Sequence, residues 1–370
     1  MLQRVEGSVR PRPKGGPKRL LTEEDYLSAF LFAQLNPVID SMRGLCACSK
    51  LERVQQEVCT RPISLGSFSE AQSVFGFERL ERVFELLVKE NLQLKASGQL
   101  KGSKLPAALQ AVDSTVLRAL PRMNWAEWRY QNTTQRAVRL HLKFNLCDRS
   151  PTGAHITDGR SCERKALLKM VTTGEFYVGD RYYGRDYQLF GVLEEKGCDY
   201  IIRLCENANR TVMEELELEP QDRSVGVVSD QVVRLGARQR WHSGPVRIVR
   251  IEKPELDEAV MVVTNRLDPK SFPAALIAEI YRHRWSIELF FRWFKCVLGR
   301  SGKSHWLAES SEGAAIQLYT ALIASLLLAR RLGKLPGKRC MEARCFHAMG
   351  MASTEELEQM LRQQLRKKVS

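Results

Sequence analysis

The stretch that decides the fold of this chain is Tyr281-Arg-His-Arg284-Trp-Ser-Ile-Glu288-Leu-Phe-Phe-Arg-Trp-Phe-Lys295. We predict one continuous helix here, with Ser271 as its N-cap and Gly299 as its end. An α-helix turns by about 100° per residue, so one stripe roughly 60° wide holds Tyr281, Arg284, Glu288 and Lys295. The stripe presents a carboxylate flanked by groups that bind phosphate.

The opposite face of the predicted helix is apolar, so one side is built to be buried. Its residues are Ile287, Leu289, Phe290, Phe291, Trp293, Phe294, Val297 and Leu298. An ordinary surface helix with an Arg284–Glu288 ion pair explains the same pattern, and periodicity alone favours that interpretation. The case for a functional site depends on two aspartates upstream and on the charge of the chain.

The whole chain is strongly basic. It has 370 residues and a formal net charge of +14, and its pI is near 9.4. This excess indicates a polyanionic partner, nucleic acid before membrane, and a basic surface kept for solubility explains it less well. We find no apolar run of membrane-spanning length and no secretion signal, and therefore expect a cytoplasmic protein without a membrane partner.

The ten cysteines are scattered along the chain. They form no C-x-x-C pair, and no paired Cys/His spacing suggests a zinc site. We interpret them as reduced, mostly structural thiols, as in cytosolic proteins.

The N-terminal part divides into an arm and a helical region. Residues 1–20 are rich in proline, glycine and basic residues, which predicts a flexible arm. Residues 21–100 predict a helical domain, and Thr22-Glu-Glu-Asp25 is a helix start signal. The segment Ser64–Glu70 resembles the turn and second-helix entry of a helix-turn-helix, which favours a DNA-binding domain. A plain helical packing domain explains these residues about as well.

After residue 105 the pattern becomes mixed. Short apolar runs predict strands at 109–117, 138–146, 153–157, 176–180 and 200–204, with helices at 161–170 and 186–196. This order predicts an α/β domain over 105–335, with a mixed sheet and flanking helices. Valine-rich runs within 207–265 predict an inserted antiparallel β-subdomain. The chain then continues through an apolar helix to a basic, partly helical tail, 336–370.

Two aspartates belong to the predicted strands. Asp113 lies inside an apolar strand, where a carboxylate costs several kcal/mol to bury unless it is paired or bound to metal. Asp180 ends a second apolar strand, and active sites gather at such strand ends. Either residue alone is explained as a turn or strand-end residue. Together with Glu288 they predict three converging carboxylates.

Converging carboxylates repel one another unless a cation compensates their charge. Oxygen ligands of this kind select Mg²⁺, with Mn²⁺ as the alternative, and we expect two ions held by Asp113, Asp180 and Glu288. Such a pair can activate a nucleophile and stabilise the leaving 3′ oxygen of a phosphodiester. Arg284 and Lys295 would hold phosphates beside the metals. Tyr281 would donate a hydrogen bond or stack on the nucleic acid.

These residues resemble the DDE triad and the YREK signature of the IS-four family of insertion-sequence transposases. The spacing from Tyr281 to Lys295 is Y-x2-R-x3-E-x6-K, and Asp180-Arg181-Tyr182-Tyr183 is similar to the family's D-R-x-Y segment. The resemblance implies an RNase H-like core with a β-rich insertion. It also implies DNA cleavage at transposon ends, followed by strand transfer through the freed 3′ hydroxyl (cut-and-paste transposition).

The resemblance implies partners and roles as well. We expect double-stranded DNA, as terminal inverted repeats and target, bound by a homodimer near the bacterial nucleoid. Arg181 and Tyr183 join the predicted DNA contacts. Relatives hold a flipped base with a tryptophan of the insertion, where this chain has Trp241 as the sole tryptophan, with a poor local match. The alternatives are a catalytically inactive or domesticated DNA-binding protein and an RNase H-type nuclease without strand transfer.

Overall fold

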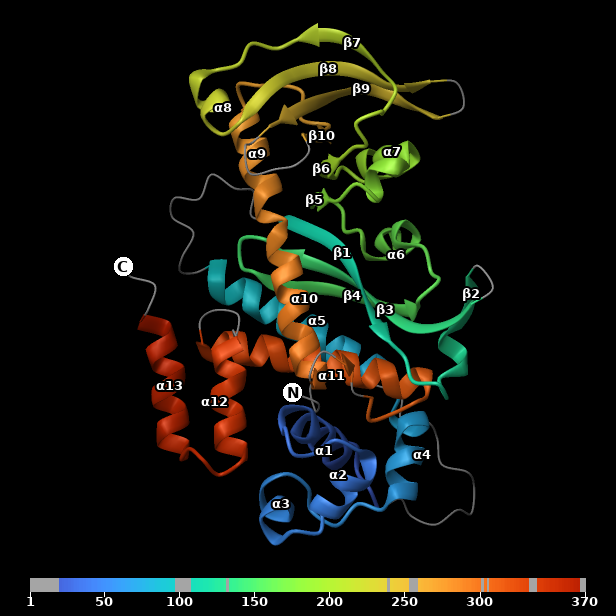
Figure 1. Ribbon diagram of the computed structural model, residues 1–370, viewed down its shortest axis with the longest axis vertical. Helices are drawn as coiled ribbons and strands as arrows, with labels where there is room; N and C mark the ends of the chain where they lie inside the picture. The colour runs from blue at the N-terminus through green and yellow to red at the C-terminus, as the bar shows by residue number, and fades with distance from the viewer. Residues whose placement is uncertain are drawn as a thin grey trace.

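The protein is built around one large mixed sheet flanked by helices, as predicted (Figure 1). The computed structural model describes residues 20–96, 108–130, 133–237, 240–252, 259–300, 303–304, 306–332 and 338–366. Most of the predicted basic arm, 1–19, lies outside the described residues. Along the sheet, the strands follow the order β2 (Glu127–Tyr130), β3 (Thr133–Asn145), β1 (Leu109–Arg118), β5 (Phe176–Gly179), β6 (Asp199–Arg203), β10 (Val260–Thr264), β9 (Arg240–Ile251), β8 (Val227–Ala237) and β7 (Arg210–Glu215).

Strand β1 is central because it pairs with β5 in parallel and with β3 antiparallel. Strand β4 (Ser150–Asp158) pairs with the other edge of β3, and β5 continues in parallel to β6. Successive β1 side chains enter different cores: Ala111 belongs to one hydrophobic cluster and Val112 to the other. This alternation, visible in the sequence, lets helices cover both faces.

Helices cover the two faces unequally. One core is built with helices α1 (Glu23–Leu35), α2 (Met42–Cys48), α4 (Leu65–Phe75), α5 (Glu78–Ala96), α10 (Trp285–Leu298) and α11 (Ser311–Leu332). The other contains side chains of α6 (Glu163–Met170) and α7 (Tyr187–Glu195). Other short elements are α3 (Glu52–Glu57), η2 (Asn124–Ala126), β11 (Gly299–Arg300) and β12 (Lys303–Ser304). Helices α12 (Lys338–Ala348) and α13 (Thr354–Arg366) end the described chain.

The strands predicted as a separate insertion continue the main sheet. Strands β7 to β10 pair antiparallel, and β10 also pairs with β6 of the central strands. The sequence did not reveal β2, β7 or the short helix α8 (Pro220–Ser224), because these segments are brief and lack an apolar alternation. The buried Arg247 joins this part to the turn before α9. Its Nε and Nη2 donate to the Asp230 carboxylate, and its Nη1 donates to the carbonyl of Phe272 at 2.6 Å.

The single long helix predicted around residue 284 is wrong. The chain forms α9 (Ala274–His283) and α10, which run end to end in Figure 1 and are separated at Arg284. The predicted N-cap, Ser271, lies in a turn where its amide donates to Asp268, and Pro273 is the N-cap instead. The Arg284 amide bonds to the Tyr281 carbonyl at 3.1 Å, so one turn tightens at the junction.

Helix α11 is long and apolar enough to cross a membrane by length and composition alone. However, 78 % of its most apolar stretch is buried inside the protein. Its side chains pack against α5, α1 and α10, as in the core helix of a globular domain.

Candidate active site

The central strand places the first predicted acid in the middle of the sheet. Asp113 lies opposite Leu142 of β3, and its side chain is 19 % exposed. Its Oδ1 accepts a hydrogen bond from the amide of Ser114 at 2.7 Å. Its Oδ2 lies 3.8 Å from Nη1 of Arg284, at the outer limit of an ion pair.

The second predicted acid follows the neighbouring parallel strand. Asp180 comes directly after β5, and its Oδ1 accepts from the amide of Tyr182 at 2.9 Å. The short helix η3 (Tyr183–Arg185) then turns the chain away from the sheet. Gly184 permits this turn, because a Cβ at that position would lie 2.1 Å from the carbonyl oxygen of Arg203.

The third predicted acid comes from the helix that crosses β1. Glu288 lies in the first turn of α10, and its Oε1 accepts from Nη2 of Arg284 at 2.7 Å. The guanidinium therefore lies between Glu288 and Asp113. The Cζ atom of Arg284 also lies 5.8 Å from the ring centroid of Tyr281, and this ring packs against the core. The tyrosine, arginine and glutamate of the predicted stripe thus share one site despite the broken helix.

The charges of this site are strongly coupled. Burial, together with the nearby carboxylates of Asp180 and Glu163, raises the pKa of Asp113 to about 7, while the Ser114 amide and Arg284 oppose the rise. Burial also raises the pKa of Tyr281. A buried carboxylate surrounded by other acids is poised to accept a cation, whether that cation is a proton, a guanidinium or a metal ion.

Glu163, in the first turn of α6, is a fourth acid that the sequence did not reveal. It forms an ion pair with Arg139 of β3. Burial raises the pKa of Glu163, and Asp180 adds to that rise. The sequence predicted helix α6. The start of this helix lies near β1 because of the order of the strands in the sheet, which the sequence does not show.

The donor set fits a hard divalent cation, since it consists of carboxylate oxygens whose mutual repulsion a cation would relieve. The described side chains, however, do not lie in coordinating positions. Within the described residues, no group of three His, Cys, Asp or Glu side chains is arranged to hold one metal ion. The Arg284 guanidinium already neutralises Asp113 and Glu288, so a cation between these two acids would have to displace it.

The other predicted DNA contacts differ in accessibility. Lys295 and Arg181 are exposed, on α10 and after β5 respectively. Tyr183 is only 2 % exposed and packs within the α6–α7 core, so its side chain is not available to DNA. That part of the prediction is wrong, because η3 folds the ring inward. Trp241, on β9, is 58 % exposed.

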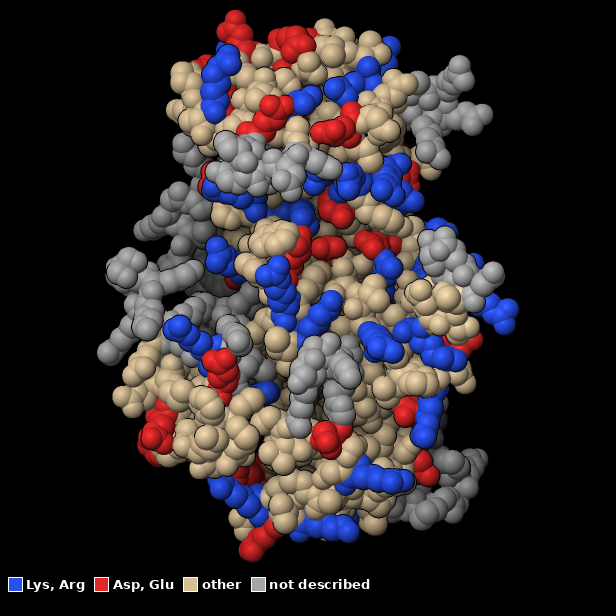
Figure 2. Space-filling model, viewed as in Figure 1, with Lys and Arg blue, Asp and Glu red and all other residues tan. Residues whose placement is uncertain are grey.

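Both kinds of charge lie on one face of the molecule. On the face shown in Figure 2, acidic side chains gather near the middle, and lysine and arginine side chains lie above and below them. A polyanion could approach such a face only if its phosphates met the basic borders while a cation screened the acidic centre.

Comparison with known proteins identifies the family. The family described as Transposase DDE domain matches residues 105–327. The protein y4zB of Sinorhizobium fredii (strain NBRC 101917 / NGR234) is 25 % identical over 234 residues, which are 62 % of this chain and 63 % of the relative. A Geobacillus stearothermophilus protein, named for insertion sequence element IS5377, is 26 % identical over 255 residues, 68 % of this chain and 63 % of the relative. The names of both relatives describe them as transposases, in each case provisionally.

The chain thus spans less than two thirds of these relatives. A structure of piggyBac transposase in a synaptic complex with hairpin DNA aligns with a TM-score of 0.45 at 11 % identity, covering 98 % of this chain and 77 % of that chain. The family match alone covers more than half of the sequence and includes all three predicted acids, and on this evidence the chain belongs to the Transposase DDE domain family.

Proposed function

We propose that this protein is a cut-and-paste DNA transposase that cleaves transposon ends and joins them to target DNA. The observation that carries the proposal is the meeting of Asp113, Arg284 and Glu288 from separate elements, with Asp180 close enough to affect the pKa of Asp113. All of these residues lie within the matched family region, 105–327. A helix with an ordinary surface ion pair would not need buried acids beneath it.

The finer family assignment is part of the same proposal. The strand order β4-β3-β1-β5-β6, with β1, β5 and β6 parallel, supports an RNase H-like core. The contacts among Tyr281, Arg284 and Glu288 support the YREK signature of the IS-four family. Lys295, two turns beyond Glu288 on α10, supplies the last cation of that signature.

In this proposal Asp113, Asp180 and Glu288 would hold Mg²⁺ or Mn²⁺. Such an ion supplies Lewis-acid stabilisation of the charge that develops on a phosphodiester during its cleavage. Arg284 leaves the carboxylates and binds a phosphate oxygen, for which its forked guanidinium is suited. Lys295 holds the neighbouring phosphate, and Tyr281 orients Arg284 through its ring.

The partners are double-stranded DNA, as transposon ends and target, and a second copy of the chain. The net charge of +14 supports the DNA partner. The N-terminal helices, with the helix start at Ser64, are the proposed DNA-binding part. We place the protein with the DNA of a bacterial cytoplasm.

The test is strand cleavage of end-containing DNA in Mg²⁺, with Asp113→Asn, Asp180→Asn and Glu288→Gln. We expect each substitution to reduce cleavage by at least about 1000-fold while DNA binding persists, because each removes a charge that the reaction needs. Lys165→Gln, an exposed cation on α6, is the matched control. Undiminished cleavage by any of the three variants would refute the assignment.

Pre-cut ends and a target plasmid separate the alternatives. A transposase joins the two DNAs, a nuclease cleaves without joining, and a non-catalytic binding protein does neither.

A further inference from the structure

The turn that follows β5 holds the carboxylate of Asp180 through its own backbone. The amide of Tyr182 donates to Oδ1 of Asp180 at 2.9 Å, so the orientation of this carboxylate depends on where the Tyr182 backbone lies. At the other end of the turn, Asp186 caps α7 by accepting from the amide of Gln188 at 3.2 Å. The turn therefore links Asp180 to the start of the next helix.

One guanidinium of α6 contacts this turn at two points. The Cζ atom of Arg164 lies 5.2 Å from the ring centroid of Tyr182, and its Nε lies 3.5 Å from Oδ2 of Asp186. The Arg164 side chain is only 27 % exposed, so water screens these contacts incompletely. The Tyr182 ring also meets the buried ring of Tyr183 edge to face, with centroids 6.1 Å apart. Two neighbours thus restrain the Tyr182 ring.

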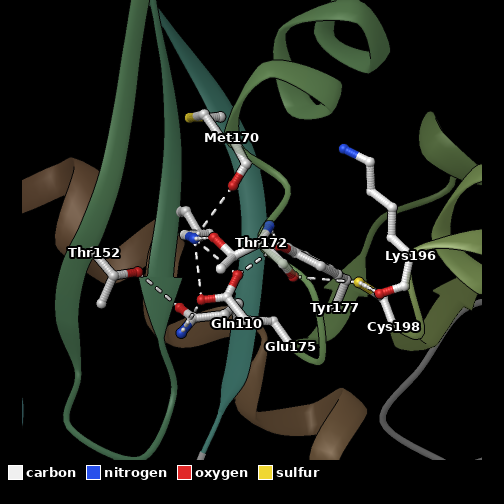
Figure 3. Close-up of polar contacts among 9 residues, drawn as sticks. Gln110, Thr152, Met170, Thr172, Glu175, Tyr177, Lys196 and Cys198 are labelled. Atoms are coloured by element: carbon white, nitrogen blue, oxygen red, sulfur yellow. Dashed lines mark hydrogen bonds and ion pairs between the residues drawn. The ribbon is translucent and has the colours of Figure 1, made fainter.

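Helix α6 is anchored at both ends, so it is a fixed support for a side chain that reaches the turn. In its first turn, Glu163 pairs with Arg139 of β3. At its last residue, the carbonyl of Met170 accepts from Nζ of Lys143 at 3.2 Å, and Lys143 also pairs with Glu175 (Figure 3). Since Arg139 and Lys143 belong to one strand, β3 holds both ends of the helix.

We propose that Arg164 is a positioning residue for Asp180 and acts through the ring of Tyr182. The inference rests on the proposed function, which makes Asp180 essential for DNA cleavage. The cation over the ring restrains the Tyr182 backbone, and the Tyr182 amide in turn orients the carboxylate. Groups that orient a metal-binding carboxylate change affinity or activity by about 10–100-fold when they are removed. The loss of Arg164 should therefore lower turnover without weakening DNA binding.

The first test is hydrogen exchange of the amide at position 182, followed by nuclear magnetic resonance on the full chain without metal or DNA. We expect Arg164→Gln and Tyr182→Leu to speed this exchange by about tenfold, because the turn opens more often. Tyr182→Phe keeps the ring and should exchange like the wild type. Lys165→Gln, at the exposed cation next to Arg164, is the matched control, and the amides of β3 are the reference for global stability.

The second test is the rate of DNA cleavage in Mg²⁺, with DNA affinity measured on the same variants. We expect Arg164→Gln and Tyr182→Leu each to lower turnover by about tenfold at unchanged affinity. The double variant should be no slower than the slower single variant, because both substitutions remove the same contact. Additive losses would overturn the inference, and so would an unchanged amide exchange in Arg164→Gln. Weaker DNA binding by Arg164→Gln would identify a phosphate contact instead and would overturn it as well.

Conservative variants decide if Arg164→Gln does not fold. Arg164→Lys keeps the charge beside Asp186 but lacks the planar face that stacks on a ring. Impaired turnover in Arg164→Lys, with wild-type turnover in Tyr182→Phe, supports the inference, and equal behaviour of the two variants refutes it. Asp180→Asn separates the two proposals. Cleavage that survives this variant refutes the site assignment, whereas the exchange experiment tests the contact between Arg164 and Tyr182 alone.

Discussion

At the scale of single residues, Arg284 holds the site together in the absence of a ligand. It donates to Glu288, approaches Asp113 and lies against Tyr281, with only 14 % of its side chain exposed. The same guanidinium is the proposed phosphate ligand. It cannot neutralise both carboxylates and bind DNA at once, so cation binding and DNA binding should be linked through this side chain.

We expect Arg284→Gln to lower the free energy of unfolding by about 1–3 kcal/mol in buffer with EDTA, because two partly buried acids lose their counter-ion. Mn²⁺ should then raise the melting temperature more in the variant than in the wild type, since no guanidinium competes with it. Arg292→Gln, at an exposed cation of the same helix, is the control. An equal Mn²⁺ effect in Arg284→Gln and wild type would show that the guanidinium does not compete.

A second residue-scale prediction concerns His141, which is 1 % exposed and hydrogen-bonds to Thr157 through Nε2 at 2.9 Å. Burial lowers the pKa of His141 to about 3, and neighbouring cations add to the effect. Folding therefore favours the neutral ring. This contribution to stability is complete above the ordinary pKa of about 6.5 and is lost progressively as the pH falls towards 3.

We expect the free energy of unfolding to fall by about 1–2 kcal/mol more in the wild type than in His141→Gln between pH 7 and pH 5. Glutamine places an amide near the position of Nε2 but does not titrate. Urea unfolding at several pH values measures the difference, and His283→Gln, at a half-exposed position, controls for the loss of a histidine. Parallel pH profiles of wild type and His141→Gln would contradict the prediction.

At the scale of elements, the orientation of α9 determines where Arg284 and Glu288 meet β1. The N-cap, Pro273, has no side chain that can cap the helix, and Asp222 of α8 supplies the acceptor instead. Its Oδ1 accepts from the amide of Ala275 at 2.6 Å, while Oδ2 accepts from the amide of Glu219. A residue of α8, between β7 and β8, thus fixes the start of the helix that leads to the site.

We expect Asp222→Ala to destabilise the protein by about 1–2 kcal/mol, the usual cost of a lost helix cap. Asp222→Asn should cost less than half of this, because the amide oxygen still accepts. Chemical denaturation measures both, and the order of the two variants is the critical result. Equal losses would mean that the charge of Asp222, not its hydrogen bond, stabilises the helix.

The elements also show which features a sequence reveals. Alternating and apolar runs correctly predicted β1, β5 and β6, because each strand's burial follows from its own residues. The break at Arg284 has no such signal, since neither proline nor glycine lies there. The burial of Tyr183 and the pairing of Glu163 with Arg139 depend on strand order and on a three-residue turn. Those are long-range properties that local patterns do not encode.

At the scale of the whole molecule, one hydrophobic core joins the N-terminal helices to the sheet. It extends from Leu21 in the N-terminal region to Leu326 in α11. Tyr319 of α11 stacks on Phe77 with ring centroids 6.0 Å apart and donates to Glu81 at 2.5 Å. The predicted regions 21–100 and 105–335 therefore share their packing.

We expect a chain of residues 105–370 to lose cooperative folding, because removing α1 to α5 exposes one side of α11. Each large apolar side chain returned to water costs about 1.5–3 kcal/mol, and several such losses exceed a typical total stability of about 5–15 kcal/mol. Thermal unfolding followed by near-ultraviolet circular dichroism measures the effect, with a chain lacking only residues 1–19 as the control that keeps its transition. A sharp, wild-type-like transition of 105–370 would instead establish an independent catalytic domain, and DNA binding by 21–100 would then be testable in isolation.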